Sequence, residues 1–79
     1  MKRSDLEEEH KLLLEHIAKV IIRARKKKGL KQTSFSEFGY SERMMVKLES
    51  GTNSPTLKTL LKLSTILEIP INKFFPKEK

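Results

Sequence analysis

A stretch of thirteen residues decides the fold of this chain: Gly39-Tyr-Ser-Glu-Arg-Met-Met-Val-Lys-Leu-Glu-Ser-Gly51. A glycine turn leads to Ser41, a good helix N-cap, and Gly51 supplies the stop. At helical spacing Met45 and Leu48 share one face, and the opposite face carries Glu42, Arg43, Val46 and Lys47. The stretch predicts a short helix over residues 41–50, held by its apolar side. A helix with such an outer face can enter a DNA major groove.

Length and charge agree with that use. The chain has 79 residues and no cysteine, so we expect one small domain stabilised by helix packing, by a homodimer interface, or by both. Residues 1–15 carry three basic and five acidic side chains, whereas the remainder carries 14 basic and five acidic ones. This excess of positive charge favours nucleic acid as the partner, although basic charge can also serve solubility alone.

No feature of the sequence indicates a membrane or an export signal. No apolar run approaches the roughly 20 residues that a membrane span needs, and the N-terminus lacks the apolar segment of a signal peptide. We therefore expect a cytoplasmic protein with no membrane partner.

The pattern of the remaining residues predicts helices separated by glycine and proline. Within residues 5–28, apolar side chains recur at helical spacing and form one stripe, and Gly29 follows as a stop signal. This pattern predicts a long first helix. A second helix lies within 31–38, with Phe35 and Phe38 as its buried side chains. Thr56 begins a fourth helix that Pro70 breaks, and residues 71–75 make a short last one. The predicted fold is all-α with five helices.

Four segments in this order resemble the phage-repressor-like helix-turn-helix family, which includes Cro, lambda repressor and XRE-type regulators. They are residues 25–32, 39–51, 54–63 and 69–75. The resemblance implies a lambda-repressor-like domain over residues 16–76, acting without enzymatic activity as a sequence-specific, DNA-binding transcriptional regulator. It also implies a homodimer. Residues 1–15 lie outside the family core and form an N-terminal helical extension with its own apolar stripe.

The second helix departs from the family pattern. Thr33 to Gly39 gives seven residues where the family typically has eight, and Lys31 replaces the usual Thr or Ser cap. The missing residue affects how this helix is oriented and how Gln32 meets a phosphate.

Within this frame the outer face of the 41–50 helix is the candidate base-reading surface. Arg43 suits guanine O6 and N7, Glu42 can accept from cytosine N4, and Val46 can contact a thymine methyl group. Lys47 serves a base or a phosphate. The alternative is an ordinary solvated face with charges at i,i+4 spacing.

A second set of residues is predicted to contact phosphate, which fixes register without reading sequence. The set comes from the basic end of the first helix, the start of the second, and the loop after the third: Lys28, Lys31, Gln32, Thr52, Asn53, Ser54 and Lys58. A solvated helix end and a plain polar loop are the alternatives.

Glu49 is the exception on the 41–50 helix, because an unpaired carboxylate there would repel phosphate. The resemblance places Arg25 at the family position that pairs with this glutamate. We expect a structural ion pair between Arg25 and Glu49, since a guanidinium matches a carboxylate in a planar fork.

The N-terminal extension has two interpretations. Leu6, Leu13 and Ile17 either fold back on the domain's own core or pair with a second subunit, and the competing family-like interface is residues 69–75. An alternative function follows from the extension: an antitoxin or adaptor that binds a protein partner through residues 1–15. The sequence predicts no catalytic residue, cofactor or metal site, because His10 and His16 do not share a helix face at i,i+4 spacing.

Overall fold

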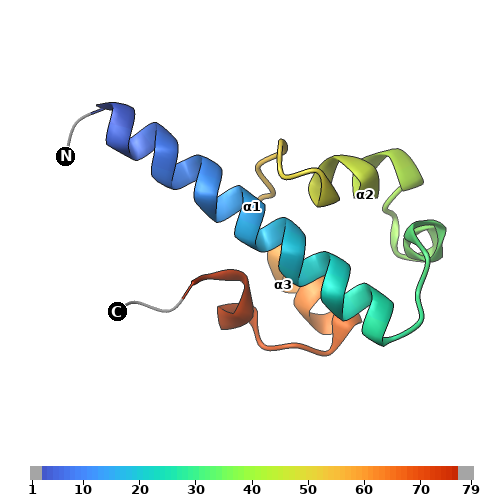
Figure 1. Ribbon diagram of the computed structural model, residues 1–79. Helices are drawn as coiled ribbons and strands as arrows, with labels where there is room; N and C mark the ends of the chain where they lie inside the picture. Colours follow the sequence, from blue (N-terminus) through green and yellow to red (C-terminus); the bar gives the residue numbers. More distant parts are fainter. Residues whose placement is uncertain (1–2, 77–79) are drawn as a thin grey trace.

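The computed structural model describes the backbone of residues 3–76 and the side chains of residues 5–76. Three α-helices and two 3-10 helices make up this part of the chain, and it contains no strand (Figure 1). They are α1 (Arg3–Lys27), η1 (Gln32–Phe38), α2 (Glu42–Glu49), α3 (Leu57–Leu67) and η2 (Ile71–Phe74). The chain is all-helical, but the second and last of the predicted helices are wound as 3-10 helices.

Helix α1 runs the length of the molecule, and its N-terminal turns project beyond the other elements (Figure 1). Its first buried side chain is Leu14, whereas Leu6 and Leu12 are 58% and 57% exposed. Of the three side chains with two interpretations, Ile17 and Leu13 therefore pack on the domain's own core, whereas Leu6 does not. Lys27 ends the helix, and Gly29 turns the chain with a φ of 72° that L side chains rarely adopt.

The core lies where the body of α1 meets the four shorter elements. Its members are apolar side chains from every element: Ile17, Ile21, Phe35, Tyr40, Met45, Leu48, Leu60, Leu63, Leu67 and Phe74. Met45 and Leu48 are buried as the spacing predicted, so α2 is held by its apolar side against the rest of the domain.

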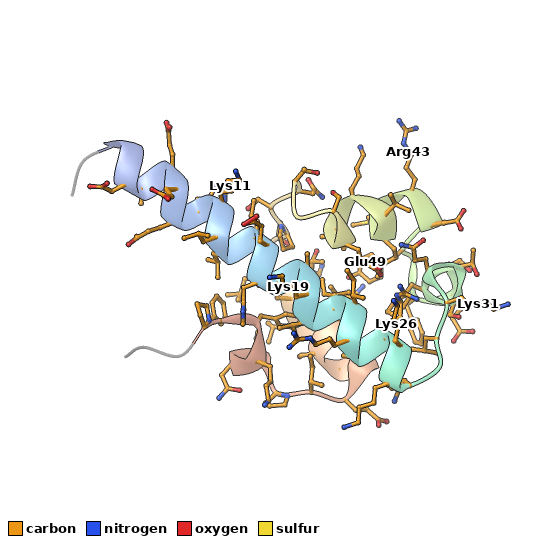
Figure 2. All side chains as sticks on the ribbon, viewed as in Figure 1. Lys11, Lys19, Lys26, Lys31, Arg43 and Glu49 are labelled. Atoms are coloured by element: carbon orange, nitrogen blue, oxygen red, sulfur yellow. The ribbon has the colours of Figure 1, made fainter. Side chains whose placement is uncertain are left out.

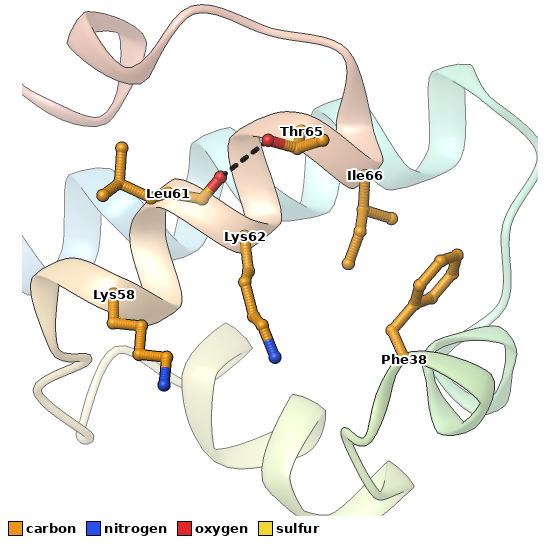
Figure 3. A pocket seen from close by; sticks show the side chains of 6 residues that line it. All are labelled: Phe38, Lys58, Leu61, Lys62, Thr65 and Ile66. Atoms are coloured by element: carbon orange, nitrogen blue, oxygen red, sulfur yellow. Dashed lines mark hydrogen bonds between the residues drawn. The ribbon is translucent and has the colours of Figure 1, made fainter.

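Element η1 carries the departure from the family spacing. A 3-10 helix rises about 2.0 Å per residue against about 1.5 Å for an α-helix, so seven residues cover about as much length as eight or nine α-helical ones. Wound this tightly, the segment can span the length that one further α-helical residue would add. Phe35 is fully buried, but Phe38 is 44% exposed, and the prediction that both are core residues was wrong for Phe38. Phe38 ends η1 and lies beside α3 rather than under it (Figure 3).

Helix α3 begins at a threonine cap and ends in a strained residue. Thr56 Oγ1 accepts a hydrogen bond from the Thr59 amide at 3.1 Å. At the other end Glu68 adopts φ 58°, the only positive φ among non-glycine residues that the structure describes. The chain then passes Pro70 into η2, whose Phe74 is fully buried.

Candidate nucleic-acid interface

The outer face of α2 carries the four predicted base-reading side chains. Glu42, Arg43 and Lys47 are exposed, and Val46 is 47% exposed. Arg43 points away from α1 and from the body of the domain (Figure 2). The structure thus gathers these residues on one free helix face, and their summed formal charge is positive.

Two local hydrogen bonds cap the ends of α2. Ser41 Oγ accepts a hydrogen bond from the Met44 amide at 3.1 Å, which makes Ser41 the N-cap. At the other end the Ser50 amide donates to the Val46 carbonyl at 3.0 Å. The helix predicted over residues 41–50 is therefore α2 together with its two caps.

Arg25 and Glu49 join α1 to α2 through two parallel hydrogen bonds. Arg25 Nε donates to Glu49 Oε2 at 2.8 Å, and Nη2 donates to Oε1 at 2.9 Å. Arg25 Nη1 also donates to the Leu30 carbonyl at 3.0 Å, and both side chains are mostly buried. Glu49 faces inward, on the side of α2 opposite Arg43 (Figure 2). Its charge is neutralised inside the protein, so it does not oppose a phosphate backbone outside.

The basic end of α1 and the start of η1 carry three of the side chains predicted to contact phosphate, and two of the three make contacts within the protein. Lys28 Nζ forms an ion pair with Glu68 at 2.9 Å, at the end of α3 rather than beside α2. Gln32 Nε2 donates to Glu49 Oε1 at 3.2 Å and so completes the Arg25 pair. Lys31 is exposed at the N-cap of η1. Of these three described residues, Lys28 and Gln32 use their side chains in contacts within the protein, and the side chain of Lys31 makes no such contact.

The loop after α2 is exposed and partly ordered by its own hydroxyl groups. Ser50 Oγ donates to the Lys47 carbonyl at 2.7 Å, and Thr52 Oγ1 lies 2.7 Å from Ser50 Oγ. Because the Ser50 proton is used, Thr52 is the donor of the second bond. Thr52, Asn53 and Ser54 are all exposed. The loop can therefore present an amide and hydroxyl groups at the C-terminal end of α2.

Lys58 is exposed in the first turn of α3, and the structure adds Lys62 one turn further on. Lys62 Nζ lies 5.8 Å from the ring centroid of Tyr40, the residue that precedes Ser41. Figure 3 shows both lysines beside an apolar groove that Phe38, Leu61, Thr65 and Ile66 also line. Sequence reasoning missed Lys62, although its i,i+4 spacing from Lys58 was a usable signal.

Among the side chains of residues 5–76, no group of three or more His, Cys, Asp or Glu residues could hold a metal ion. None of the helices in the described part of the chain is both long and apolar enough to cross a bilayer. What the geometry does provide is a short helix with a free polar face, positioned by η1, α1 and a capped turn. That arrangement defines the helix-turn-helix class of DNA-binding domains.

Comparison with known families agrees with this class. A helix-turn-helix family model of the Cro/C1-type, or XRE, group matches residues 21–74. The chain belongs to this family of phage-repressor-like DNA-binding transcription regulators. Comparison with curated proteins and with solved structures gave no match.

Proposed function

We propose that the chain is a sequence-specific transcriptional regulator that inserts α2 into the DNA major groove. The observation that carries the proposal is the division of α2 into a buried side and a free side. Its one inward acid, Glu49, is paired with Arg25, and Glu42, Arg43, Val46 and Lys47 remain outside. In this proposal residues 16–76 form the DNA-binding domain and residues 1–15 extend it.

Phosphate contacts in this proposal come from both sides of α2. Lys31 lies at the N-cap of η1, while Thr52, Asn53, Ser54 and Lys58 follow the C-terminal end of α2. Lys62 joins them because it shares a face of α3 with Lys58. These contacts set the register of the domain on the duplex.

Base and phosphate contacts predict different responses to mutation. Arg43→Ala should cost about 1–3 kcal/mol of binding free energy and relax the preference at one base pair. Lys58→Ala should weaken binding to all DNA sequences alike, and the number of counterions released on binding should fall by about one. Lys28→Ala is the matched control, because Lys28 is engaged with Glu68.

The measurement is a gel shift with DNA from upstream of the protein's own gene, at two salt concentrations, followed by a randomised-site selection. If no duplex binds in a salt-sensitive way, the proposal fails. If Arg43→Ala leaves the selected sequence unchanged, α2 does not read bases.

We further propose that two copies occupy a near-palindromic site, with half-sites about one helical turn, or ~34 Å, apart. Protein-to-duplex stoichiometry on such a site checks this: one copy per site would contradict it.

The rival function is an antitoxin or adaptor that binds another protein through the projecting part of α1. The exposed leucines there favour it, and failure of DNA binding together with capture of a protein by residues 1–15 would establish it.

A further inference from the structure

One side of α1 and the segment around η2 form a single exposed surface, which we call the α1–η2 face. Leu12, Leu13, His16 and Phe75 line one hollow on it, and Val20, Arg23, Ile69 and Lys73 line the next. His16 Nε2 lies 3.1 Å from the Lys73 carbonyl oxygen and ties the two elements together. The N-terminal helix and residues 69–75, predicted as competing interfaces, therefore lie on one surface.

The α1–η2 face is apolar in the middle and oppositely charged at its ends. Leu12 and Phe75, 57% and 43% exposed, provide apolar area near its centre. Glu8 and Glu9 are exposed at the N-terminal end, and Arg23 and Lys73 at the other end. Such a surface is complementary to itself only when a second copy lies in the opposite direction, because that arrangement sets acid against base.

The spacing along α1 fits that arrangement. Residues 9, 12, 16, 20 and 23 recur every three or four positions, so they share one side of the helix. The spacing reads the same in both directions from His16. We propose that a second copy of the chain packs antiparallel on the α1–η2 face, with Glu9 of each copy against the partner's Arg23. Leu12 of each copy then meets the partner's Val20.

This contact leaves α2 uncovered. Leu14, Ala18 and Arg25 lie on the side of α1 roughly opposite His16, and that side faces α2 and its following loop. An antiparallel pair therefore directs its two α2 helices to opposite outer sides. Side-by-side binding to one near-palindromic site needs both helices on the same side, so it uses a different surface. The antiparallel pair can instead hold two duplex segments. This bridging rests on the DNA binding proposed above. The self-association itself does not depend on DNA binding.

Exchanging the charges of Glu9 and Arg23 tests how the two α1 helices are aligned, and the test needs no DNA. Sedimentation equilibrium of the full chain should show a dimer that Glu9→Lys or Arg23→Glu each weakens about tenfold. An equimolar mixture of these two variants, and the double variant, should both recover the wild-type mass, because each unlike pair is restored. Both positions are exposed, so circular dichroism should show an unchanged fold. A wild-type chain that stays monomeric at roughly 100 µM overturns the proposal, and so does a mixture that stays monomeric.

The apolar centre has its own matched pair of variants. Leu12→Glu should abolish the dimer, while Leu57→Glu, a similarly exposed leucine on α3, should leave it unchanged. Equal loss of the dimer in both variants would place the contact elsewhere. Capture of a second labelled duplex by protein bound to an immobilised one should disappear with Leu12→Glu, whereas gel-shift binding to a single half-site should persist. Dimers that bind no DNA would refute only the proposed function, and DNA binding without dimers would refute only the antiparallel pair.

Discussion

Arg25 satisfies three acceptor atoms from two parts of the chain. Its guanidinium spans both Glu49 oxygens and the Leu30 carbonyl, and Gln32 adds a fourth bond to the same cluster. The cluster ties α1, the turn before η1, and the last residue of α2 together. Arg25 thus adds to the buried side chains of α2 a polar link that orients α2 relative to α1. Lysine has neither the fork nor the reach to make the same three bonds.

We therefore expect loss of either member of the pair to destabilise the fold. Arg25→Ala and Glu49→Ala should each lower the free energy of unfolding by about 2–3 kcal/mol, because the remaining charge is left largely buried. Arg25→Lys should recover only part of this. Urea denaturation measures the effect. Lys28→Ala, which breaks the solvent-exposed pair with Glu68, should cost less than about 1 kcal/mol. Near-wild-type stability of both alanine variants would contradict a structural role for the pair.

The two phenylalanines of η1 offer a second comparison at this scale. Phe35→Ala should cost about 3–5 kcal/mol, since it leaves a cavity where a fully buried ring was. Phe38→Ala removes the same group from a 44% exposed position, so its cost should be about 1 kcal/mol or less. Thermal melting of both variants is sufficient. Equal costs would mean that Phe38 is covered in solution.

Among the elements, α2 and the centre of α1 could be predicted from the sequence because local rules decide them. The Ser41 cap, the Met45 and Leu48 spacing, and the glycine stops act within a few residues. The winding of η1 could not be predicted this way, because the local pattern of residues 31–38 does not distinguish a 3-10 helix from an α-helix. The partner of Lys28 was missed because it comes from the end of α3, 40 positions along the chain. The role of Arg25 came from family resemblance rather than from local pattern.

The end of α3 gives a prediction about backbone strain. Glu68 adopts a left-handed conformation that costs an L residue about 1–2 kcal/mol, whereas glycine adopts it freely. Glu68→Gly and Glu68→Ala both remove the carboxylate that pairs with Lys28, but only alanine keeps the Cβ atom. The glycine variant should therefore be more stable than the alanine variant by about 1 kcal/mol in urea denaturation. The opposite order would show that the entropy of the unfolded glycine chain outweighs the relief of strain.

At the scale of the whole molecule, α1 has two parts: one belongs to the core and the other projects from it. From Leu14 onward it is part of the core and holds α2 through Arg25. Before Leu14 it projects from the domain, which gives the molecule its long dimension of 41 Å. Its acidic N-terminal end lies away from the outer face of α2, so it does not repel DNA at the proposed contact surface (Figure 2).

Removal of residues 1–11 tests this division. Residues 5–11 are all exposed, so their loss should change the unfolding free energy of the remaining chain by no more than about 0.5 kcal/mol. Gel-shift affinity for a single half-site should stay within roughly a factor of two, because the removed segment lies outside the proposed contacts. Self-association should weaken, because Glu8 and Glu9 are removed, but it should not be abolished, because Leu12 remains. Denaturation, gel shift and sedimentation on the same truncated sample separate these effects. A truncated chain that unfolds at much lower denaturant would mean that the projecting turns stabilise the core of the DNA-binding domain, against the boundary proposed for residues 1–15.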